Sequence, residues 1–253
     1  MIIGAVLLTC ACGSKHDERA AAGVADSLAI VPNTLPGDST IYGIACDGCN
    51  DTILIYLPTI SADPDTMNIL AASKQHQVFG RMKIGDVIAI IPNASNPKVG
   101  DMVVNVEALK GRWCFLAAPT LRERAGMSSS ERANHSLKRD SVLRSMLQPR
   151  EFGIELKGEN TARPISSISY SIATDENSPV VYPKIKRYRR WHLYNGKLIL
   201  SETSRDSLGN VFITSSDTAA LLLLRPDTMA LKFKDRVQGY YSQHSISPSS
   251  SGN

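Results

Sequence analysis

The sequence predicts a mostly β protein made of two small antiparallel barrels or sandwiches, and three observations predict it. Short apolar runs rich in Ile, Val, Leu and Tyr recur from residue 39 to residue 243, and Gly, Pro, Asn and Asp separate them. In residues 39–108 these runs are so closely spaced that no crossover helices fit between them, which favours antiparallel pairing. A content of 43% apolar and 21% charged residues indicates a globular chain and excludes a disordered acidic protein or a membrane channel.

An apolar leader, residues 1–12, opens the chain. The run from Ile2 to Thr9 is too short to span ~30 Å of hydrocarbon as a helix, but it suits the core of a signal peptide. The string Ala11-Cys12-Gly13-Ser14 follows, and it resembles the lipobox of bacterial lipoproteins. The resemblance implies that Cys12 is lipidated. Cys10, with a leucine three residues upstream, is the alternative, and a buried strand with two incidental cysteines is the other interpretation. The leader departs from the signal pattern because no Lys or Arg precedes its apolar run.

Lipidation of the leader cysteine would also predict where the protein is located in the cell. Several acyl chains hold a protein on a bilayer where one chain gives marginal binding, so we expect a lipid-anchored protein of the bacterial cell envelope, at the outer membrane. Residues 13–38 are rich in Ala, Gly, Ser, Pro and Asp and predict a flexible tether. The polar residues 244–253 predict a disordered tail.

The first module is expected at residues 39–108, where six runs predict strands: STIYGIAC, DTILIYLP, MNILAAS, HQVFG, DVIAIIPN and DMVVNVEAL. The second is expected at residues 109–243. There, residues 128–147 have near-helical spacing and predict one inserted helix. The strand runs that follow include YRRWHLYNG, KLILSETS, NVFITSS, TAALLLLR and TMALKFK, with a hairpin signal at Asn195-Gly196. They predict a meander of about eight strands.

The opening Leu109-Lys110-Gly111-Arg112-Trp113, followed by this meander, resembles the lipocalin-like domains of bacterial lipoproteins. The resemblance covers residues 109–241 and implies a closed barrel. A barrel of this size either holds one small apolar ligand or is filled by its own side chains.

The pair Cys46 and Cys49 is the motif with most chemical content in the body of the chain. In an oxidising compartment a local disulfide is the leading interpretation, and it would pin a turn. A soft-metal site for Cu or Zn needs further ligands, for which Cys114, His76, Met82 and His192 are the candidates. A redox dithiol is the third interpretation, although Asp47 between the cysteines disfavours a thiolate. Cys114, beside Trp113, is expected to be a buried small apolar residue.

The string from Tyr42 to Cys49, with the alternating Thr52-Ile53-Leu54-Ile55 behind it, resembles the N-terminal domain of the NlpE family of lipoproteins. The resemblance implies a role in copper handling or envelope-stress signalling. It does not extend to a second cysteine pair, because nothing after Cys114 supplies one.

Five cations and three aromatic residues are concentrated in residues 184–192. Arg190, Trp191 and His192 are the candidates for an anion or glycan site, or for contact with a membrane surface. The alternative is a solvated edge strand protected by charge, because strand alternation divides the cations between two faces.

Together these features favour a non-catalytic binding or structural role, with a small apolar ligand or an envelope protein as partner. A metal-handling or stress-sensing protein and a surface glycan-binding protein are the alternatives. The sequence contains no G-x-S-x-G, H-E-x-x-H or phosphate-loop motif, so no enzyme is predicted. A net charge of +4 is too small to indicate nucleic-acid binding.

Overall fold

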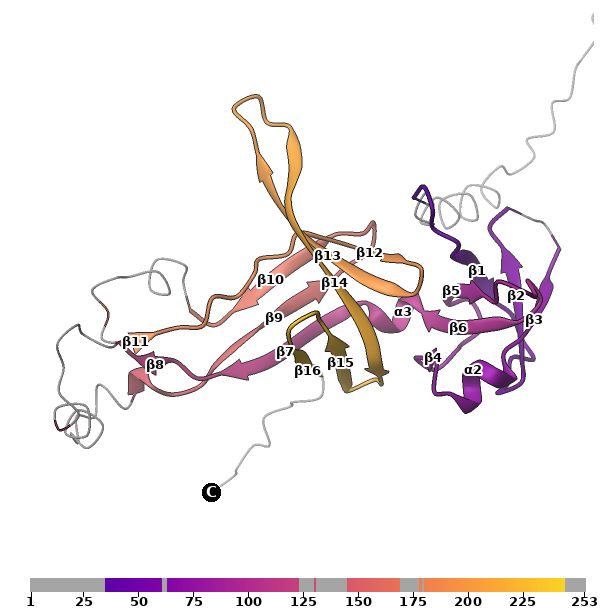
Figure 1. Ribbon diagram of the computed structural model, residues 1–253, viewed down its shortest axis with the longest axis horizontal. Coiled ribbons are helices and arrows are strands. Elements are labelled where there is room, and N and C mark those ends of the chain that lie inside the picture. Colours follow the sequence, from indigo (N-terminus) through magenta and orange to yellow (C-terminus); the bar gives the residue numbers. More distant parts are fainter. Residues whose placement is uncertain are drawn as a thin grey trace, which may run out of the picture. The chain divides into compact units, whose positions relative to one another are not determined.

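The computed structural model describes residues 35–60, 63–122, 130, 145–168, 178 and 180–243. These residues form two main β-sheets and few helices, as the sequence predicts (Figure 1). The leader with Cys10 and Cys12, most of the expected tether, almost all of the expected helix at 128–147 and the tail from residue 244 lie outside the described residues. No helix in the described part of the chain is long and apolar enough to cross a membrane.

The N-terminal sheet has six strands in the order β3-β2-β1-β5-β6-β4. All its pairs are antiparallel except β4 with β6, which is parallel. Its strands are β1 (Ile41–Ala45), β2 (Ile53–Pro58), β3 (Asp65–Asn68), β4 (Val78–Phe79), β5 (Val87–Pro92) and β6 (Gly100–Asn105).

Two short helices replace parts of expected strands. In the run MNILAAS the strand ends at Asn68, whose side chain accepts the N–H of Leu70 at 3.0 Å, and helix α2 (Leu70–Lys74) follows. In DMVVNVEAL the strand ends at Asn105, whose side chain accepts the N–H of Ala108 at 3.0 Å and caps helix α3 (Val106–Leu109). In both places the asparagine side chain accepts a backbone N–H group in place of a neighbouring strand. The strands end there for this reason.

Leu54, Ile88, Ile90 and Val103, none of them exposed, form the centre of the N-terminal core. Inward residues alternate with partly exposed ones along β2, as the period of a half-buried strand requires. Gly43 on β1 has a structural role here, because a Cβ at this position would lie 2.7 Å from the carbonyl oxygen of Leu57 on β2.

The second sheet has eight strands in the order β10-β9-β7-β16-β15-β14-β13-β12. Within this sheet, strands that follow one another in the chain are also neighbours in space. The last strand, β16, pairs with the first, β7. This is the up-and-down meander that the sequence predicts. The strands are β7 (Gly111–Ala117), β9 (Arg150–Leu156), β10 (Ala162–Ser166), β12 (Arg190–Tyr194), β13 (Lys197–Arg205), β14 (Val211–Leu224), β15 (Thr228–Lys232) and β16 (Val237–Ser242).

A short seam between β10 and β12 nearly closes this sheet into a barrel. The seam consists of one isolated bridge, Thr161 with Arg190, and two flanking hydrogen bonds. Ala162 N–H donates to the Arg189 carbonyl at 2.8 Å, and Trp191 N–H donates to the Asn160 carbonyl at 2.9 Å. The other neighbouring pairs in the barrel have longer ladders, with one register shift each in β13–β14 and β14–β15, except β16 with β7, which shows two residue pairs.

Large apolar side chains fill much of the barrel. Leu198, Leu200, Met229 and Leu231 are at most 1% exposed. Trp113 is also buried, and its indole N–H donates to the Leu109 carbonyl at 2.7 Å. The two strands β7 and β9 approach closely at Gly153, where a Cβ would lie 2.1 Å from the carbonyl oxygen of Trp113.

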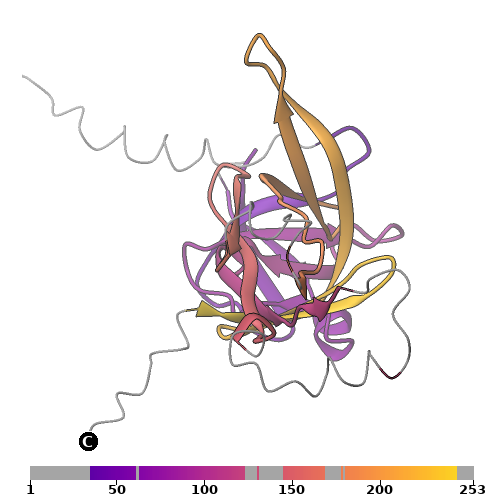
Figure 2. The ribbon, with the colours of Figure 1, turned by 90° about the vertical axis from the view of Figure 1, so that its left-hand side faces the viewer.

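The predicted hairpin turn at Asn195-Gly196 is present, and the strands differ from the prediction in one respect. Asn195 and Gly196 both have positive φ, 47° and 75°, as the predicted tight hairpin requires. The two runs NVFITSS and TAALLLLR form one long strand, β14, which pairs with β13 and continues beyond the barrel wall (Figures 1 and 2). A separate two-stranded sheet joins β8 (Thr120–Leu121) to β11 (Val180–Val181).

Candidate functional site

The Cys46 and Cys49 pair lies in the turn between β1 and β2. Local hydrogen bonds fix this turn: the Asp47 carboxylate accepts the N–H of Gly48 at 2.8 Å, and Cys46 N–H donates to the Ile55 carbonyl at 2.9 Å. Gly48 has a φ of +87°, which favours glycine at this position. The glycine between the cysteines is therefore a requirement of the turn.

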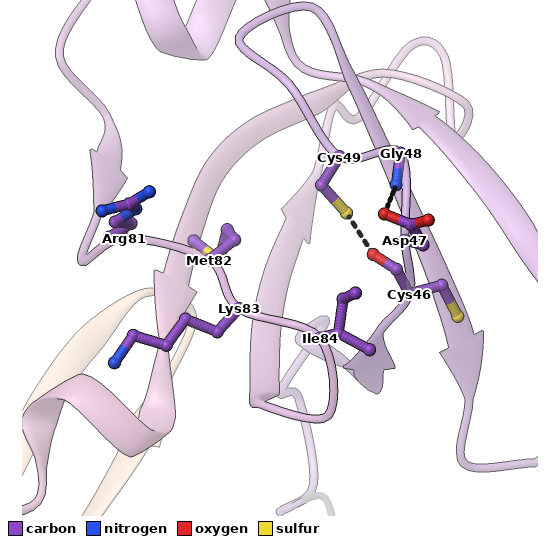
Figure 3. Close-up of a pocket in the computed structure, with 8 residues that line it drawn as sticks. All are labelled: Cys46, Asp47, Gly48, Cys49, Arg81, Met82, Lys83 and Ile84. Atoms are coloured by element: carbon purple, nitrogen blue, oxygen red, sulfur yellow. Dashed lines mark hydrogen bonds between the residues drawn. The ribbon is translucent and has the colours of Figure 1, made fainter.

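Both cysteines are free thiols in the structure. The Cys49 thiol lies 3.2 Å from the Cys46 carbonyl and 3.2 Å from the Ile55 carbonyl, and the Cys46 thiol lies 3.7 Å from the Ile44 carbonyl. Figure 3 shows the Cys46 sulfur pointing away from Cys49. The disulfide expected between these residues is not formed in this structure, and its formation requires the Cys46 side chain to rotate.

A second loop faces this turn and completes an open pocket of about 440 Å³ (Figure 3). The loop contributes Arg81, Met82, Lys83 and Ile84. Met82 and Cys49 are both partly buried, and both pack against the core of the N-terminal sheet. Two thiols and one thioether thus line one pocket, with two cations beside them.

Of the four further ligands considered for a metal, only Met82 lines this pocket. Cys114 lies on β7 and His192 on β12. His76 follows α2 and does not line the pocket. The described residues contain no group of three or more His, Cys, Asp or Glu side chains placed to hold a metal ion, so any metal at the cysteines depends on the methionine.

Cys114 is buried and 0% exposed, as expected from the sequence. Burial, followed by the nearby charge of Glu151, raises the pKa of its thiol to about 11. A buried thiol of this kind is inert near neutral pH.

A second pocket, of about 380 Å³, lies at one end of the barrel, and we call it the mouth pocket. The last residue of β7, Ala117, and the turn before β16 border it. Phe115 and Tyr240 form its aromatic wall, with their rings edge to face at 5.5 Å. Its lining residues are Phe115, Leu116, Ala117, Gly153, Ile154, Pro183, Lys184, Ile185, Lys186, Tyr188, Arg236, Gln238 and Tyr240.

The polar side of the mouth pocket is organised by Asp217 on β14. Its carboxylate accepts hydrogen bonds from the Lys186 ammonium at 2.6 Å and from the Tyr188 hydroxyl. Burial alone would raise the pKa of the Asp217 carboxyl, but these two hydrogen bonds outweigh it and hold the pKa below its usual value. Arg236 stacks 4.7 Å above the ring of Phe233, and Lys184 is exposed at the rim.

The structure separates Arg190, Trp191 and His192, which the sequence grouped as an anion or glycan site. Trp191 is 2% exposed, and its indole N–H donates to the Lys157 carbonyl at 2.8 Å. Its ring is inside the barrel and cannot stack on a sugar, so the aromatic part of that prediction is wrong. Arg190 remains exposed. His192 is partly buried, and burial lowers its pKa.

Sequence reasoning missed the mouth pocket. Lys184, Lys186 and Tyr188 fall within the basic run that was singled out, but Asp217 and Arg236 come from other strands and turns. Alternation tells which residues point inward, whereas it gives no signal for which end of a barrel stays open.

Comparison of the chain with protein-family models, with curated proteins and with solved structures found no match. The proposals below therefore depend on this chain's own residues.

Proposed function

We propose that this chain is a ligand-binding lipoprotein of the bacterial cell envelope, and that the mouth pocket of its barrel binds a small amphipathic anion of the fatty-acid type. The observation that carries the proposal is that the pocket is lined by apolar side chains on one side and by cations on the other. Phe115, Ile154 and Tyr240 offer an apolar wall, while Lys184 and Arg236 offer positive charge. Ligand pockets typically measure ~300–1,000 Å³ and are found in the mouths of β-barrels, so about 380 Å³ suits a small ligand.

The charge at the rim selects the ligand class. Lys186 is neutralised by Asp217, whereas the Lys184 ammonium is exposed and has no ion-pair partner among the described residues. An apolar molecule without charge would gain nothing from this cation. An acyl chain with a carboxylate head would gain both the apolar wall and the ion pair.

The test is titration of the full chain, with Cys10→Ser and Cys12→Ser to prevent lipidation, with laurate and with dodecanol. The Lys184→Ala variant should bind laurate up to about fivefold more weakly, as an exposed ion pair predicts, and dodecanol equally well. Ala117→Phe, which fills the pocket, should weaken both ligands. Lys232→Ala removes an exposed cation from β15 and serves as the matched control. Equal binding of laurate by the parent chain and Ala117→Phe would overturn the proposal.

The envelope address in this proposal is supported by the leader and its cysteines. Labelling of cells with an alkyne analogue of palmitate should mark the parent chain and the Cys10→Ser variant, but not Cys12→Ser. The opposite pattern would assign the lipid to Cys10. An unlabelled parent chain would remove the lipid anchor from the proposal.

A second candidate function, binding of Cu(I) by the N-terminal module, is favoured by the position of Met82. Thiolate and thioether are soft ligands, and a site that combines them favours Cu(I) over Zn. Cys46, Cys49 and Met82 line the same pocket. The metal needs both thiols reduced, so the expected disulfide and the metal are competing states of one pair.

Competition with a chromogenic Cu(I) chelator tests this candidate. Met82→Leu should weaken Cu(I) binding and leave Zn binding unchanged, and Cys46→Ser should abolish both. Met102→Leu, on β6 and outside the pocket, is the control. Unchanged Cu(I) affinity in Met82→Leu would reject the thioether ligand.

A further inference from the structure

The outer end of the β13–β14 hairpin carries large apolar side chains that the described residues leave uncovered. Leu208 is 85% exposed, Ile213 58%, Val211 53% and Phe212 48%. We call these four residues the tip. Clustered apolar side chains on a surface mark an interaction site, whereas single ones need no explanation.

The tip stands away from the barrel wall. β12 pairs with β13 only as far as Ser201, and β15 pairs with β14 only from Ala220. Residues 202–205 therefore pair with residues 211–215 alone, and Figures 1 and 2 show this ribbon projecting from the barrel. At ~3.3 Å per residue the strands extend the ribbon by roughly 10 Å before the turn.

Apolar side chains lie on both faces of the ribbon and at its apex, all of them on the β14 side or in the turn. Ile213 lies opposite Thr203, Phe212 opposite Ser204 and Val211 opposite Arg205. Because neighbouring side chains on a strand point to opposite faces, Val211 and Ile213 share one face and Phe212 lies on the other. Leu208 lies in the turn between the strands. A groove on a protein covers one face of a ribbon, whereas lipid surrounds it, so this distribution favours a bilayer as the occupant.

The turn at the apex satisfies its own backbone. The Asp206 carboxylate accepts the N–H groups of Leu208 at 2.9 Å and Asn210 at 2.8 Å, and the Gly209 N–H donates to the Asp206 carbonyl at 3.1 Å. Unpaired N–H groups are costly in lipid, so this turn is suited to entry. Hydrogen bonds from Asn210 lower the pKa of Asp206, and its charge limits the insertion to the headgroup boundary.

Exposed cations lie at the level where the ribbon leaves the barrel. The backbone N–H of Arg187 donates to the Glu202 carboxylate at 2.7 Å, and that of Arg189 donates to the Ser201 carbonyl at 2.8 Å. Lys184 and Arg190 are exposed in the same segment. A tip inserted by ~5–10 Å brings these cations within about one Debye length, ~10 Å, of the headgroups, where anionic lipids attract them.

We propose that the tip is a lipid-inserting element, with Leu208, Val211, Phe212 and Ile213 entering the boundary of an anionic bilayer while the exposed cations Lys184, Arg189 and Arg190 face the headgroups. This contact is additional to the lipid on the leader. It also does not depend on ligand binding in the mouth pocket.

The test uses the full chain with Cys10→Ser and Cys12→Ser, mixed with vesicles of phosphatidylcholine alone or with phosphatidylglycerol. In a Phe212→Trp variant the added indole should shift its emission to the blue on vesicles that contain phosphatidylglycerol, and less on phosphatidylcholine alone. Val237→Trp is the control, because Val237 is similarly exposed, at 60%, on the barrel wall. Its emission should not move.

A triple variant, Leu208→Ser, Phe212→Ser and Ile213→Thr, should lower sedimentation with these vesicles by more than about tenfold, because each buried apolar side chain contributes about that factor. The substituted residues are exposed, so thermal unfolding should stay unchanged and show that the barrel is intact. Two results would overturn the proposal: unchanged sedimentation of the triple variant, or a blue shift that follows protein concentration without vesicles, which would assign the tip to self-association.

Discussion

The hydroxyl of Tyr188 donates a hydrogen bond to the carboxylate of Asp217, and this bond ties the segment before β12 to β14. Tyr188 is 7% exposed, and burial, followed by the Asp217 hydrogen bond, raises its pKa above the usual value. The phenol therefore remains a donor at neutral pH. Because Lys186 binds the same carboxylate, Asp217 organises both the mouth pocket and the base of the projecting ribbon.

Replacement of Asp217 by Asn should change the acid stability of the protein. The folded-state pKa of Asp217 is depressed, so its stabilisation is present above the unfolded-state pKa of about 3.9 and is lost as the pH falls through the folded-state value. Urea unfolding of Asp217→Asn at pH 7 should show a loss of about 1–3 kcal/mol, and a flatter dependence below about pH 4. Asp235→Asn, at an exposed carboxylate, is the control. Parallel curves for Asp217→Asn and the parent would contradict the assignment.

Gly153→Ala should destabilise the barrel by about 1–3 kcal/mol or more, because its Cβ would lie 2.1 Å from the Trp113 carbonyl oxygen and β7 and β9 would have to separate. The control is Gly239→Ala on β16, where a Cβ meets nothing within 4 Å. Thermal unfolding midpoints of the two variants are compared, and that of Gly153→Ala should be the lower. Equal midpoints for both would show that the two strands can move apart without cost.

The three body cysteines should differ in reactivity. In reduced chain with Cys10→Ser and Cys12→Ser, alkylation at neutral pH should add two groups, at Cys46 and Cys49, and a third only after denaturation. Cys114 is excluded because it is 0% exposed and has a pKa raised to about 11 by burial. Protein taken unreduced from an oxidising compartment should take up one group, after denaturation, if the pair has closed. Three groups on folded protein would contradict the burial of Cys114.

The seam between β10 and β12 should be the first part of the barrel to open. Two flanking hydrogen bonds, from Ala162 N–H and Trp191 N–H, accompany its one bridge, whereas β13 and β14 share a long ladder. Amide hydrogen exchange should therefore be faster at Ala162 and Trp191 than at Leu198 and Leu200. Slower amide exchange at the seam than within β13 would show that the seam is not the first part of the barrel to open.

Alternation and turn chemistry predicted most of the fold. The hairpin at Asn195-Gly196 and the eight-stranded meander are confirmed, because both follow from local signals. Two helices were missed, at Leu70–Lys74 and Val106–Leu109, since five or fewer residues carry no helical period. The continuity of β14 was missed because its polar residues, such as Thr214 and Ser216, resemble a break but lie on an exposed ribbon.

The sites were less predictable than the fold. Cys46 and Cys49 are close in sequence, so their turn could be located. Met82 was one of four candidate metal ligands, and the structure places it alone of the four at the cysteine pocket. Trp191 was expected at a surface site because a basic run suggests exposure, whereas alternation along β12 turns its side chain inward. The mouth pocket is lined by β7, β9, the segment before β12, and β16 with the turn before it, and contacts between segments so far apart in the chain leave no local pattern in the sequence.

The pairing of β16 with β7 has a consequence for synthesis of the chain. Along the meander every other contact forms between strands that are neighbours in the chain, but this pair joins the first strand to the last. The barrel wall cannot be completed until its final strand has left the ribosome. Until then β7 keeps one open edge, and an open edge needs a chaperone or rapid completion of the chain to escape wrong pairing.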